Sequence, residues 1–408
     1  MWSSERPLPG RVKVCQARHR MIFMKRIIMF GGGSGSRDIT MALCRAGDAL
    51  TRVVPAWDSG GSSKALREAL GILAMGDIRQ ALMTMAHGEG RVGSVVRFFN
   101  ARMSDTASQS DLQAEFDFYL SGTHPLLGMM APGIRDAVLN YLRVFQSKIG
   151  NDFNYRHGSI GNFVLTGAYF AHGRDINTAI GVFRKLCGIN GHVWPATTDD
   201  RVELRADLRD GSQVRGQDSV TALPPALAGI GIRHVHLTQT NAAPGLHHCP
   251  MANPAVLEAI GTADAIVFGP GSFYTSTMAH LAVNGITQAI SATAPHVPKI
   301  LIGNILECPE TTGRTLAELQ QDFALCSGSN VLTHLIVNQG WVPFERVLNG
   351  FRYLPQGCIR PGADVMPQVI ADDFEDPWNR GKHDASKIAT TLAAIVESTQ
   401  RPPRPPKH

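Results

Sequence analysis

The stretch RIIMFGGGSGS at residues 26–36 decides the fold of this chain of 408 residues. A short apolar run without alternation is typical of a buried parallel strand, and the glycines after it allow a sharp turn. Residues 38–47 are predicted to form a helix that ends in a glycine, and residues 50–56 to form a second strand. This order of strand, glycine loop, helix and strand predicts a Rossmann-like, doubly wound α/β fold with a mostly parallel sheet.

A second stretch, DAIVFGPGSFYTS at residues 264–276, repeats this design. Loops at the carboxyl ends of parallel strands lie at one edge of a sheet, where the N–H groups of a helix's first turn can bind an anion. We therefore predict that the two loops hold one anionic ligand rather than being two unrelated turns. The residues predicted to contact it are Gly32, Gly33, Ser34, Gly35, Gly269, Pro270, Gly271, Ser272 and Thr275.

A third loop, WDSGGSS at residues 57–63, follows the second predicted strand. A carboxylate beside a phosphate often holds Mg²⁺ or a sugar hydroxyl, so Asp58 is predicted to be a metal ligand. The backbone and hydroxyl groups of Gly60, Gly61, Ser62 and Ser63 would supply further donors to the ligand. The alternative is a helix cap built from Asp58 and the serines.

Two further glycine-containing loops carry polar side chains, GDIR at residues 76–79 and RHGSIGN at residues 156–162. Arg79 and His157 are candidates for phosphate contacts. The alternative for Asp77 and Arg79 is a local ion pair or a helix cap. The alternative for His157 is a structural role, which is the more common one for a single histidine in a loop.

The remaining segments are predicted to complete a single domain over residues 25–398, with a helical lid at 64–150 and a β-hairpin excursion at 192–221. A basic leader at 1–24, disordered or not translated, precedes this domain, and a proline-rich tail at 399–408 follows it. The other predicted helices are 174–187, 254–261, 273–283, 315–325 and 384–398. The other predicted strands of the parallel sheet are 232–238, 264–268, 287–291, 299–303 and 333–338.

The net charge of +5 comes from the two chain ends, and the segment between them is slightly acidic. No basic face for nucleic acid is therefore expected. The seven cysteines form no CxxC pair, which suits a reducing compartment. No apolar run approaches the length of a membrane-spanning helix. We expect a cytoplasmic protein that binds neither nucleic acid nor membrane, and a homodimer is left open.

Taken together, these motifs resemble the family of 2-phospho-L-lactate transferase (CofD) and the gluconeogenesis factor (YvcK, UPF0052). The matching motifs run in family order over about residues 27–390, so the resemblance covers most of the chain. They lie at residues 31–35, 58–63, 66–67, 71–72, 76–79, 161–162, 253–260 and 269–276.

The resemblance implies a Rossmann-like core with a helical lid, and two kinds of function. CofD-type members move 2-phospholactate from a guanosine-diphosphate-linked donor to a deazaflavin hydroxyl with Mg²⁺ and release GMP. YvcK-type members bind UDP-sugars and act in the regulation of carbon metabolism and cell-wall growth. We therefore predict a CofD-like transferase that binds a GDP- or UDP-linked small molecule. The alternative is a UDP-sugar-binding regulator without catalysis.

The resemblance also suggests roles for single residues. Asp58, Arg79 and His157 are the predicted catalytic residues, with Asp58 holding the magnesium ion. Asp77, Gly161 and Asn162 join the predicted nucleotide-binding residues. The chain departs from the family pattern at Ser59, where a second acid is usual, and at Trp57 and Lys64, where small residues are usual.

A third functional hypothesis is an NAD-linked dehydrogenase, based on the first glycine loop and an acid about 25 residues further on. It is disfavoured because Ser36 stands where the dinucleotide fingerprint has its last glycine.

Overall fold

The computed structural model describes residues 24–33, 35–240, 249–328, 331–340, 345–347, 350–358 and 367–400. Ser34, one of the predicted phosphate contacts, lies outside the described residues. So do the predicted leader, apart from Met24, and the predicted tail beyond Gln400.

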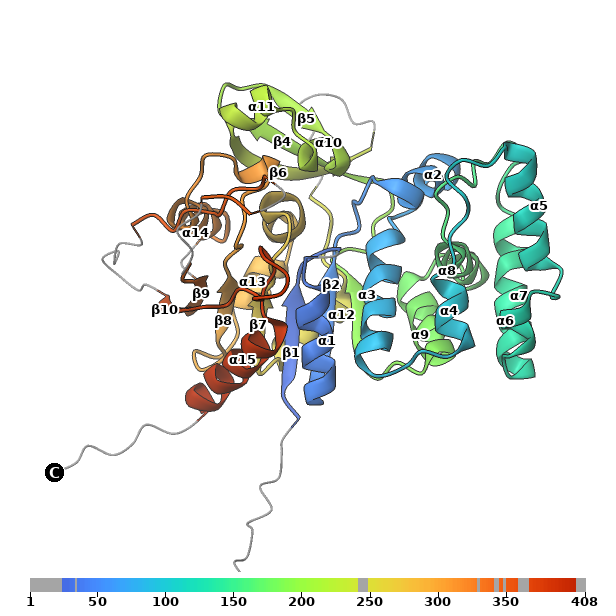
Figure 1. Ribbon diagram of the computed structural model, residues 1–408, viewed down its shortest axis with the longest axis horizontal. Coiled ribbons are helices and arrows are strands. Elements are labelled where there is room, and N and C mark those ends of the chain that lie inside the picture. Colours follow the sequence, from blue (N-terminus) through green and yellow to red (C-terminus); the bar gives the residue numbers. More distant parts are fainter. Residues whose placement is uncertain are drawn as a thin grey trace, which may run out of the picture.

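In the described part of the chain, seven parallel strands form the central sheet in the order β10-β9-β8-β7-β1-β2-β3 (Figure 1). The strand order reverses between β1 and β7, which pair directly although they are far apart in the sequence. The predicted doubly wound α/β fold is therefore confirmed. The strands are β1 (Arg26–Phe30), β2 (Ala49–Val54), β3 (His192–Pro195), β7 (Ala265–Phe268), β8 (Lys299–Ile302), β9 (His334–Asn338) and β10 (Gln368–Asp372).

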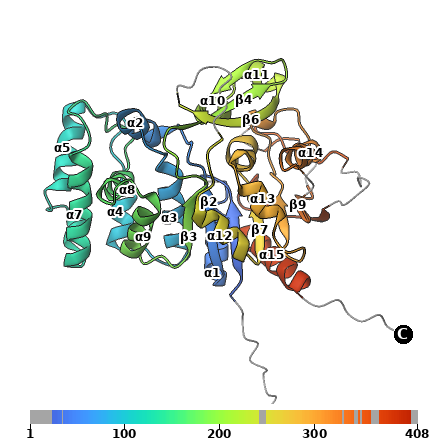
Figure 2. The ribbon, with the colours of Figure 1, turned by 180° about the vertical axis from the view of Figure 1, so that it is seen from behind.

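Helices cover both faces of this sheet, which explains why β7 and β8 are buried at every position. Figure 1 shows α1 (Arg37–Ala46), α3 (Gly76–Gly88) and α15 (Ala385–Gln400) in front of the strands. Figure 2 shows the opposite face with α12 (Pro254–Thr262) and α13 (Ile286–Ser291). The helix α14 (Leu316–Cys326) connects β8 to β9.

The predicted lid segment at 64–150 is helical, but its helix α3 covers the sheet. Its other helices, together with α8 and α9 further along the chain, form a separate layer beside the sheet, at the right of Figure 1. Its core is aromatic: the rings of Phe145 and Phe163 stack with centroids 4.6 Å apart, and those of Phe116 and Tyr155 stack at 4.8 Å. The helices of this layer are α2 (Gly61–Leu70), α4 (Ser94–Phe99), α5 (Gln109–Leu120), α6 (Pro125–Gly128), α7 (Pro132–Gln146), α8 (Ile160–Ala171) and α9 (Ile176–Cys187).

A small antiparallel sheet lies at the top edge of the central sheet in Figure 1, on the same side as α2. It contains β4 (Val202–Leu208) and β5 (Gln213–Arg215), the hairpin predicted from the sequence, followed by α10 (Gln217–Thr221) and α11 (Pro225–Ile230). The predicted excursion at 192–221 is wrong at its start, because His192–Pro195 is β3 of the central sheet and pairs parallel with β2. Its third strand is β6 (Ile232–Gln239), which pairs antiparallel with β4.

Two predicted strands of the parallel sheet are therefore wrong. The segment 232–238 is β6 of the small sheet, because Arg233, His234 and His236 leave it only half buried, whereas a central parallel strand is apolar on both faces. The segment 287–291 is the helix α13, in which Ile286 and Ile290 lie one turn apart and are fully buried.

The predicted regular helix at 273–283 is also different in detail. It consists of a π-helical turn, η1 (Phe273–Thr277), followed by a 3-10 turn, η2 (Met278–Ala282). Single π-helical turns are rare and occur often at functional sites. The strand β10 was not predicted from the sequence.

Within the part of the chain that the structure describes, no helix is both long enough and apolar enough to span a bilayer.

Candidate functional site

The two glycine loops lie in contact at the point where the strand order reverses. The N–H of Gly269 donates to the carbonyl oxygen of Phe30 at 2.9 Å, at the start of both loops. A Cβ atom on Gly35 would lie only 2.7 Å from the Cα of Gly271, so the backbones touch and no larger residue fits. The prediction that these loops share one edge of the sheet is thus met by their geometry.

Asn304, which follows β8, fastens the second loop. Its Nδ2 donates to the carbonyl oxygen of Gly271 at 2.7 Å, and its Oδ1 accepts the N–H of Gly271 at 3.3 Å. Sequence analysis missed this residue. The signal was present, because Ile302, Gly303 and Asn304 form another strand-to-glycine transition.

A buried cation lies beneath the first loop. The Nη2 of Arg52, on β2, donates to the carbonyl oxygen of Gly31 at 2.8 Å, and its Nη1 donates to Thr40 on α1. Burial lowers the pKa of Arg52 to about 10, and the carboxyl group of Asp77 acts against this shift. Arg52 therefore stays charged at neutral pH and adds positive potential below the loop.

Asp77, in the first turn of α3, lies directly over this loop. Its Oδ1 accepts the N–H of Gly33 at 2.9 Å, and a Cβ on Gly32 would lie 3.0 Å from its Oδ2. Burial raises the pKa of Asp77 to about 7, and the charge of Asp58 adds to the shift. Asp77 thus titrates near neutral pH beside the predicted phosphate cradle.

Asp58, in the loop between β2 and α2, is held by the start of α2. Its Oδ1 accepts the N–H of Gly60 at 3.1 Å, and its Oδ2 accepts the hydroxyl of Ser63 at 2.7 Å. A Cβ on Gly76 would lie 2.8 Å from its Oδ2, so Asp58 also borders the start of α3, which bears Asp77. Burial raises its pKa, and the charge of Asp218 acts in the same direction.

Asp218, on α10, was not predicted as a site residue. Its Oδ1 accepts the hydroxyl of Ser59 at 2.7 Å, and its own N–H donates to that hydroxyl at 3.1 Å. A carboxylate from the small sheet region therefore lies beside Ser59, the residue next to Asp58 in the sequence. Only the fold brings it there.

Arg79, predicted to contact phosphate, is almost fully buried on α3. Its Nε donates to Asn162 Oδ1 at 3.1 Å, and Asn162 Nδ2 donates in turn to Ser62. Its two remaining nitrogens donate to Asn100 at 3.4 Å and Gln80 at 3.3 Å. Burial lowers the pKa of Arg79 to about 10. The hydrogen bonds from Arg79 to Asn162 and from Asn162 to Ser62 therefore connect α3, α8 and α2.

Gly161 and His157 lie at the lid side. A Cβ on Gly161 would lie 2.4 Å from the carbonyl oxygen of Phe99, so this glycine allows α8 to approach the carboxyl end of α4. The imidazole of His157 is exposed, and its Nδ1 lies 2.9 Å from Asp105 Oδ1. The structure does not bring His157 to the glycine loops through any contact in the described residues.

Thr275 follows the second glycine loop and is hydrogen-bonded to a buried acid, Glu310, in the short turn η3 (Pro309–Thr311). The carboxylate of Glu310 accepts the Thr275 hydroxyl at 2.6 Å, the Thr275 N–H at 3.1 Å and the Tyr274 N–H at 2.8 Å. Burial raises the pKa of Glu310, and these donors oppose the rise. The indole of Trp57 donates to the Thr275 carbonyl at 3.0 Å. These bonds fix the turn η1 at the edge of the site.

Two cavities adjoin this edge. One of about 110 Å³ lies past the carboxyl ends of β8 and β9 and is lined by Asn304, Ile305, Asn338 and Tyr353 among others. A larger one of about 820 Å³ lies between α2 and the small sheet and reaches Ser59 and Asp218.

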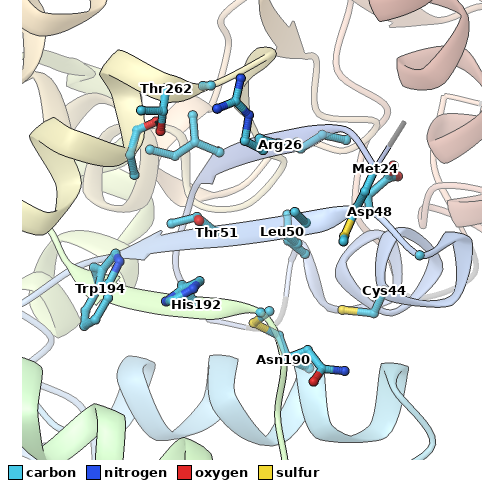
Figure 3. A pocket seen from close by; sticks show the side chains of 18 of the residues that line it. Met24, Arg26, Cys44, Asp48, Leu50, Thr51, Asn190, His192, Trp194 and Thr262 are labelled. Carbon is cyan, nitrogen blue, oxygen red and sulfur yellow. Dashed lines mark hydrogen bonds between the residues drawn. The ribbon is translucent and has the colours of Figure 1, made fainter. Parts of the chain in front are cut away.

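A third cavity, of about 750 Å³, lies at the opposite, amino-terminal ends of β1, β2 and β3. Figure 3 shows Arg26, Thr51, His192 and Trp194 around it. It is lined by none of the predicted site residues.

The described residues contain no group of three or more His, Cys, Asp or Glu side chains placed to hold a metal ion. The pair of histidines next to Cys249 in the sequence lies outside the described residues.

Comparison with known proteins agrees with this architecture. A sequence profile of the family described as 2-phospho-L-lactate transferase CofD matches residues 27–351. The gluconeogenesis factor of Listeria monocytogenes is 28% identical over 375 residues, covering 91% of this chain and 95% of that protein. The putative gluconeogenesis factor of a Nostoc species is 28% identical over 393 residues, covering 93% of this chain and 71% of that protein.

A crystal structure of a UPF0052 family member from Bacillus halodurans has the same fold, with a TM-score of 0.64 and 23% identity. The match covers 91% of this chain and 99% of that one.

Proposed function

The chain belongs to the family of 2-phospho-L-lactate transferase CofD, and we propose that it binds the diphosphate of a nucleotide-linked small molecule at its two glycine loops. The observation that carries this proposal is the contact of Gly35 with Gly271 where the strand order reverses. Nucleotides bind at this point in sheets of this topology. The guanidinium group of Arg52 beneath the loop favours an anion there.

The ligand would extend in both directions from the loops. The cavity past β8 and β9, beside Asn304, has room only for part of a nucleoside and is a candidate for the base. Asp58 and Asp77 lie on the β2 side of the loops, away from β8 and β9, and this is where the linked group would lie. The proposal leaves the base open between guanine and uracil.

Magnesium fits the chemistry of this edge. Mg²⁺ is usually held by one or two carboxylates together with the phosphates of the substrate, so a full protein cage is not required. Asp58 would hold the ion, and the carboxyl groups of Asp77 and Asp218 lie close enough to interact electrostatically with Asp58. When bound, the ion would neutralise charge on the phosphoryl oxygens.

We propose a transfer reaction at this site. An acceptor hydroxyl attacks a phosphorus of the diphosphate, a new oxygen–phosphorus bond forms, and the bond to the bridging oxygen breaks to release the nucleoside monophosphate. The hydroxyl proton passes to Asp77, whose pKa of about 7 suits a proton acceptor at neutral pH. The resemblance to CofD-type members makes a phospho-hydroxyacid the first candidate for the transferred group.

The other predicted catalytic residues receive less support from their contacts. The donors of Arg79 are engaged by three side chains, so its proposed role is to position Asn162 and, through it, Ser62. His157 pairs with Asp105 in the lid. A direct role for His157 stays a prediction.

A second candidate is a regulator that binds a UDP-sugar without catalysis. Two observations favour it. The relatives compared above are named gluconeogenesis factors, and Ser59 leaves Asp58 without an adjacent acid in the sequence. Binding alone does not require a complete metal site.

The test is calorimetry with GDP, UDP, GDP-mannose, UDP-N-acetylglucosamine and NAD, each with and without Mg²⁺. We expect one nucleotide diphosphate to bind, more tightly with Mg²⁺, and NAD not to bind. At a hundred times its dissociation constant, a ligand stabilises the fold by about 2.7 kcal/mol, so thermal shifts provide a second readout. Failure of all these nucleotides to bind would refute the proposal.

Product analysis then separates the two candidates. Release of a nucleoside monophosphate in the presence of an acceptor alcohol supports the transferase. Tight binding with no release over hours selects the regulator.

A further inference from the structure

The cavity between α2 and the small sheet is a compartment of its own. Its volume of about 820 Å³ lies within the range of small-molecule binding sites. It shares the wall formed by Ser59 and Asp218 with the candidate site. None of the residues of the two glycine loops lines it. A molecule in this cleft would therefore lie beside the nucleotide, not in its place.

Acidic and basic side chains both line the cleft, but most of the acids are already engaged. Asp218 accepts the hydroxyl of Ser59 at 2.7 Å. The carboxylate of Glu203 lies 3.8 Å from the Nε of the buried Arg205. Glu68 is the third acid of the lining and lies exposed on α2.

Three cations of the lining, by contrast, have no such engagement. In the described part of the chain, the side chains of Lys64, Arg201 and Arg215 make no hydrogen bond or ion pair. Lys64 lies on α2, Arg201 directly before β4, and Arg215 on β5. The fourth cation, Arg67, donates to the carbonyl oxygens of Asp58 at 3.0 Å and of Val202. Arg67 thereby connects the candidate site to the small sheet. Lys64, Arg201 and Arg215 are the cations that could bind a ligand.

The fold holds Arg201 in a conformation that is unfavourable for a residue with a Cβ. Its φ is 59°, and its carbonyl oxygen accepts both the N–H of Thr240 at 2.6 Å and the Thr240 hydroxyl at 2.7 Å. Its side chain runs past Gly71, where a Cβ would lie 3.1 Å from the guanidinium Nε. The positions of its backbone and side chain are thus defined by neighbours.

We propose that this cleft binds a second small molecule that carries two anionic groups, phosphate or carboxylate, held by Arg201, Arg215 and Lys64. Guanidinium groups bind such anions through paired hydrogen bonds, and cations from three separate segments suit a ligand with anionic groups at both ends. The proposal goes beyond the nucleotide site and does not depend on whether a transfer takes place there.

The test uses one sugar skeleton with increasing charge: glucose, glucose 6-phosphate and glucose 1,6-bisphosphate, titrated into the full chain by calorimetry. We expect affinity to rise with each phosphate and to fall with added salt. In the double variant Arg201→Met and Arg215→Met, the bisphosphate should bind at least about tenfold more weakly, because two charge-assisted contacts are lost. Lys64→Met, on a different element, should weaken binding independently.

Arg233→Met is the matched control. Arg233 is exposed on β6 of the same small sheet and does not line the cleft, so its loss removes one positive charge, as Lys64→Met does. Equal weakening in this variant, or a wild-type affinity that does not depend on the number of phosphates, would overturn the proposal.

A second arm separates this proposal from the nucleotide proposal. The bisphosphate should bind equally well to Gly35→Ala, which alters the glycine loops alone. Competition between the bisphosphate and a bound nucleotide would overturn the assignment of separate compartments. Binding of the bisphosphate without any nucleotide binding would refute the proposed function and leave the cleft assignment standing.

Discussion

Replacing Asp77 with asparagine should make the protein more stable at pH 8 while weakening its function. The folded protein raises the pKa of this carboxyl group from 3.8 to about 7. Between these values the folded chain binds more protons than the unfolded chain, so the free energy of unfolding falls as the pH rises through this window. Above pH 7 Asp77 is ionised in the folded protein, and the free energy of unfolding is reduced by the full amount.

The magnitude follows from the size of the shift. About three pKa units correspond to up to about 4 kcal/mol of stability that the wild type loses between pH 4 and pH 7. An asparagine at this position keeps an oxygen for the N–H of Gly33 and carries no charge to be repelled by Asp58. The variant should therefore match the wild type near pH 4 and exceed it by a few kcal/mol at pH 8.

The assay is urea unfolding of both proteins at several pH values from 4.5 to 8, with the difference between them plotted against pH. Asp136→Asn is the control, because Asp136 is exposed on α7 and far from the site. A stability difference for Asp77→Asn that stays constant with pH would refute the reasoning. The variant should also lose ligand binding, since residues that serve a site often reduce stability.

Three further predictions concern the same edge of the sheet. Asp58→Asn should fold normally but lose the Mg²⁺-dependent part of nucleotide binding and turnover, and unchanged dependence on Mg²⁺ in calorimetry would exclude Asp58 as the ligand. Arg52→Met should lower the free energy of unfolding, measured with urea, by about 2–4 kcal/mol, because the Gly31 carbonyl loses its buried donor and Asp77 loses a compensating charge. An unchanged urea midpoint would contradict this prediction. Gly35→Ala should lower nucleotide affinity by about tenfold or more, because its Cβ would collide with Gly271; an unchanged dissociation constant would show that the contact of the loops does not matter for binding.

The sequence by itself determined the local elements around the site. The apolar run at 26–30 and the glycines after it specify a strand and a tight turn through short-range sterics alone. Gly33 has a φ of 44° and Gly271 a φ of 151°, conformations that a residue with a Cβ rarely adopts. Such constraints act within a few residues, so they can be recognised without knowing the fold.

The tertiary structure alone decided which of these loops meet and which polar groups join them. Asp77 bonds to Gly33 across 44 residues of sequence, and Asn304 fastens Gly271 across 33. Sequence reasoning placed Asp77 among the site residues only through a family resemblance and missed Asn304, Glu310 and Asp218.

The same limit explains the wrong strand assignments. A short segment such as 287–291 has both strand and helix character, and the burial of Ile286 and Ile290 on one face decided in favour of a helix. Strand order, burial and the pKa of a carboxyl group depend on neighbours that are distant in the chain. The site is therefore a property of packing, whereas its glycine loops are a property of the sequence.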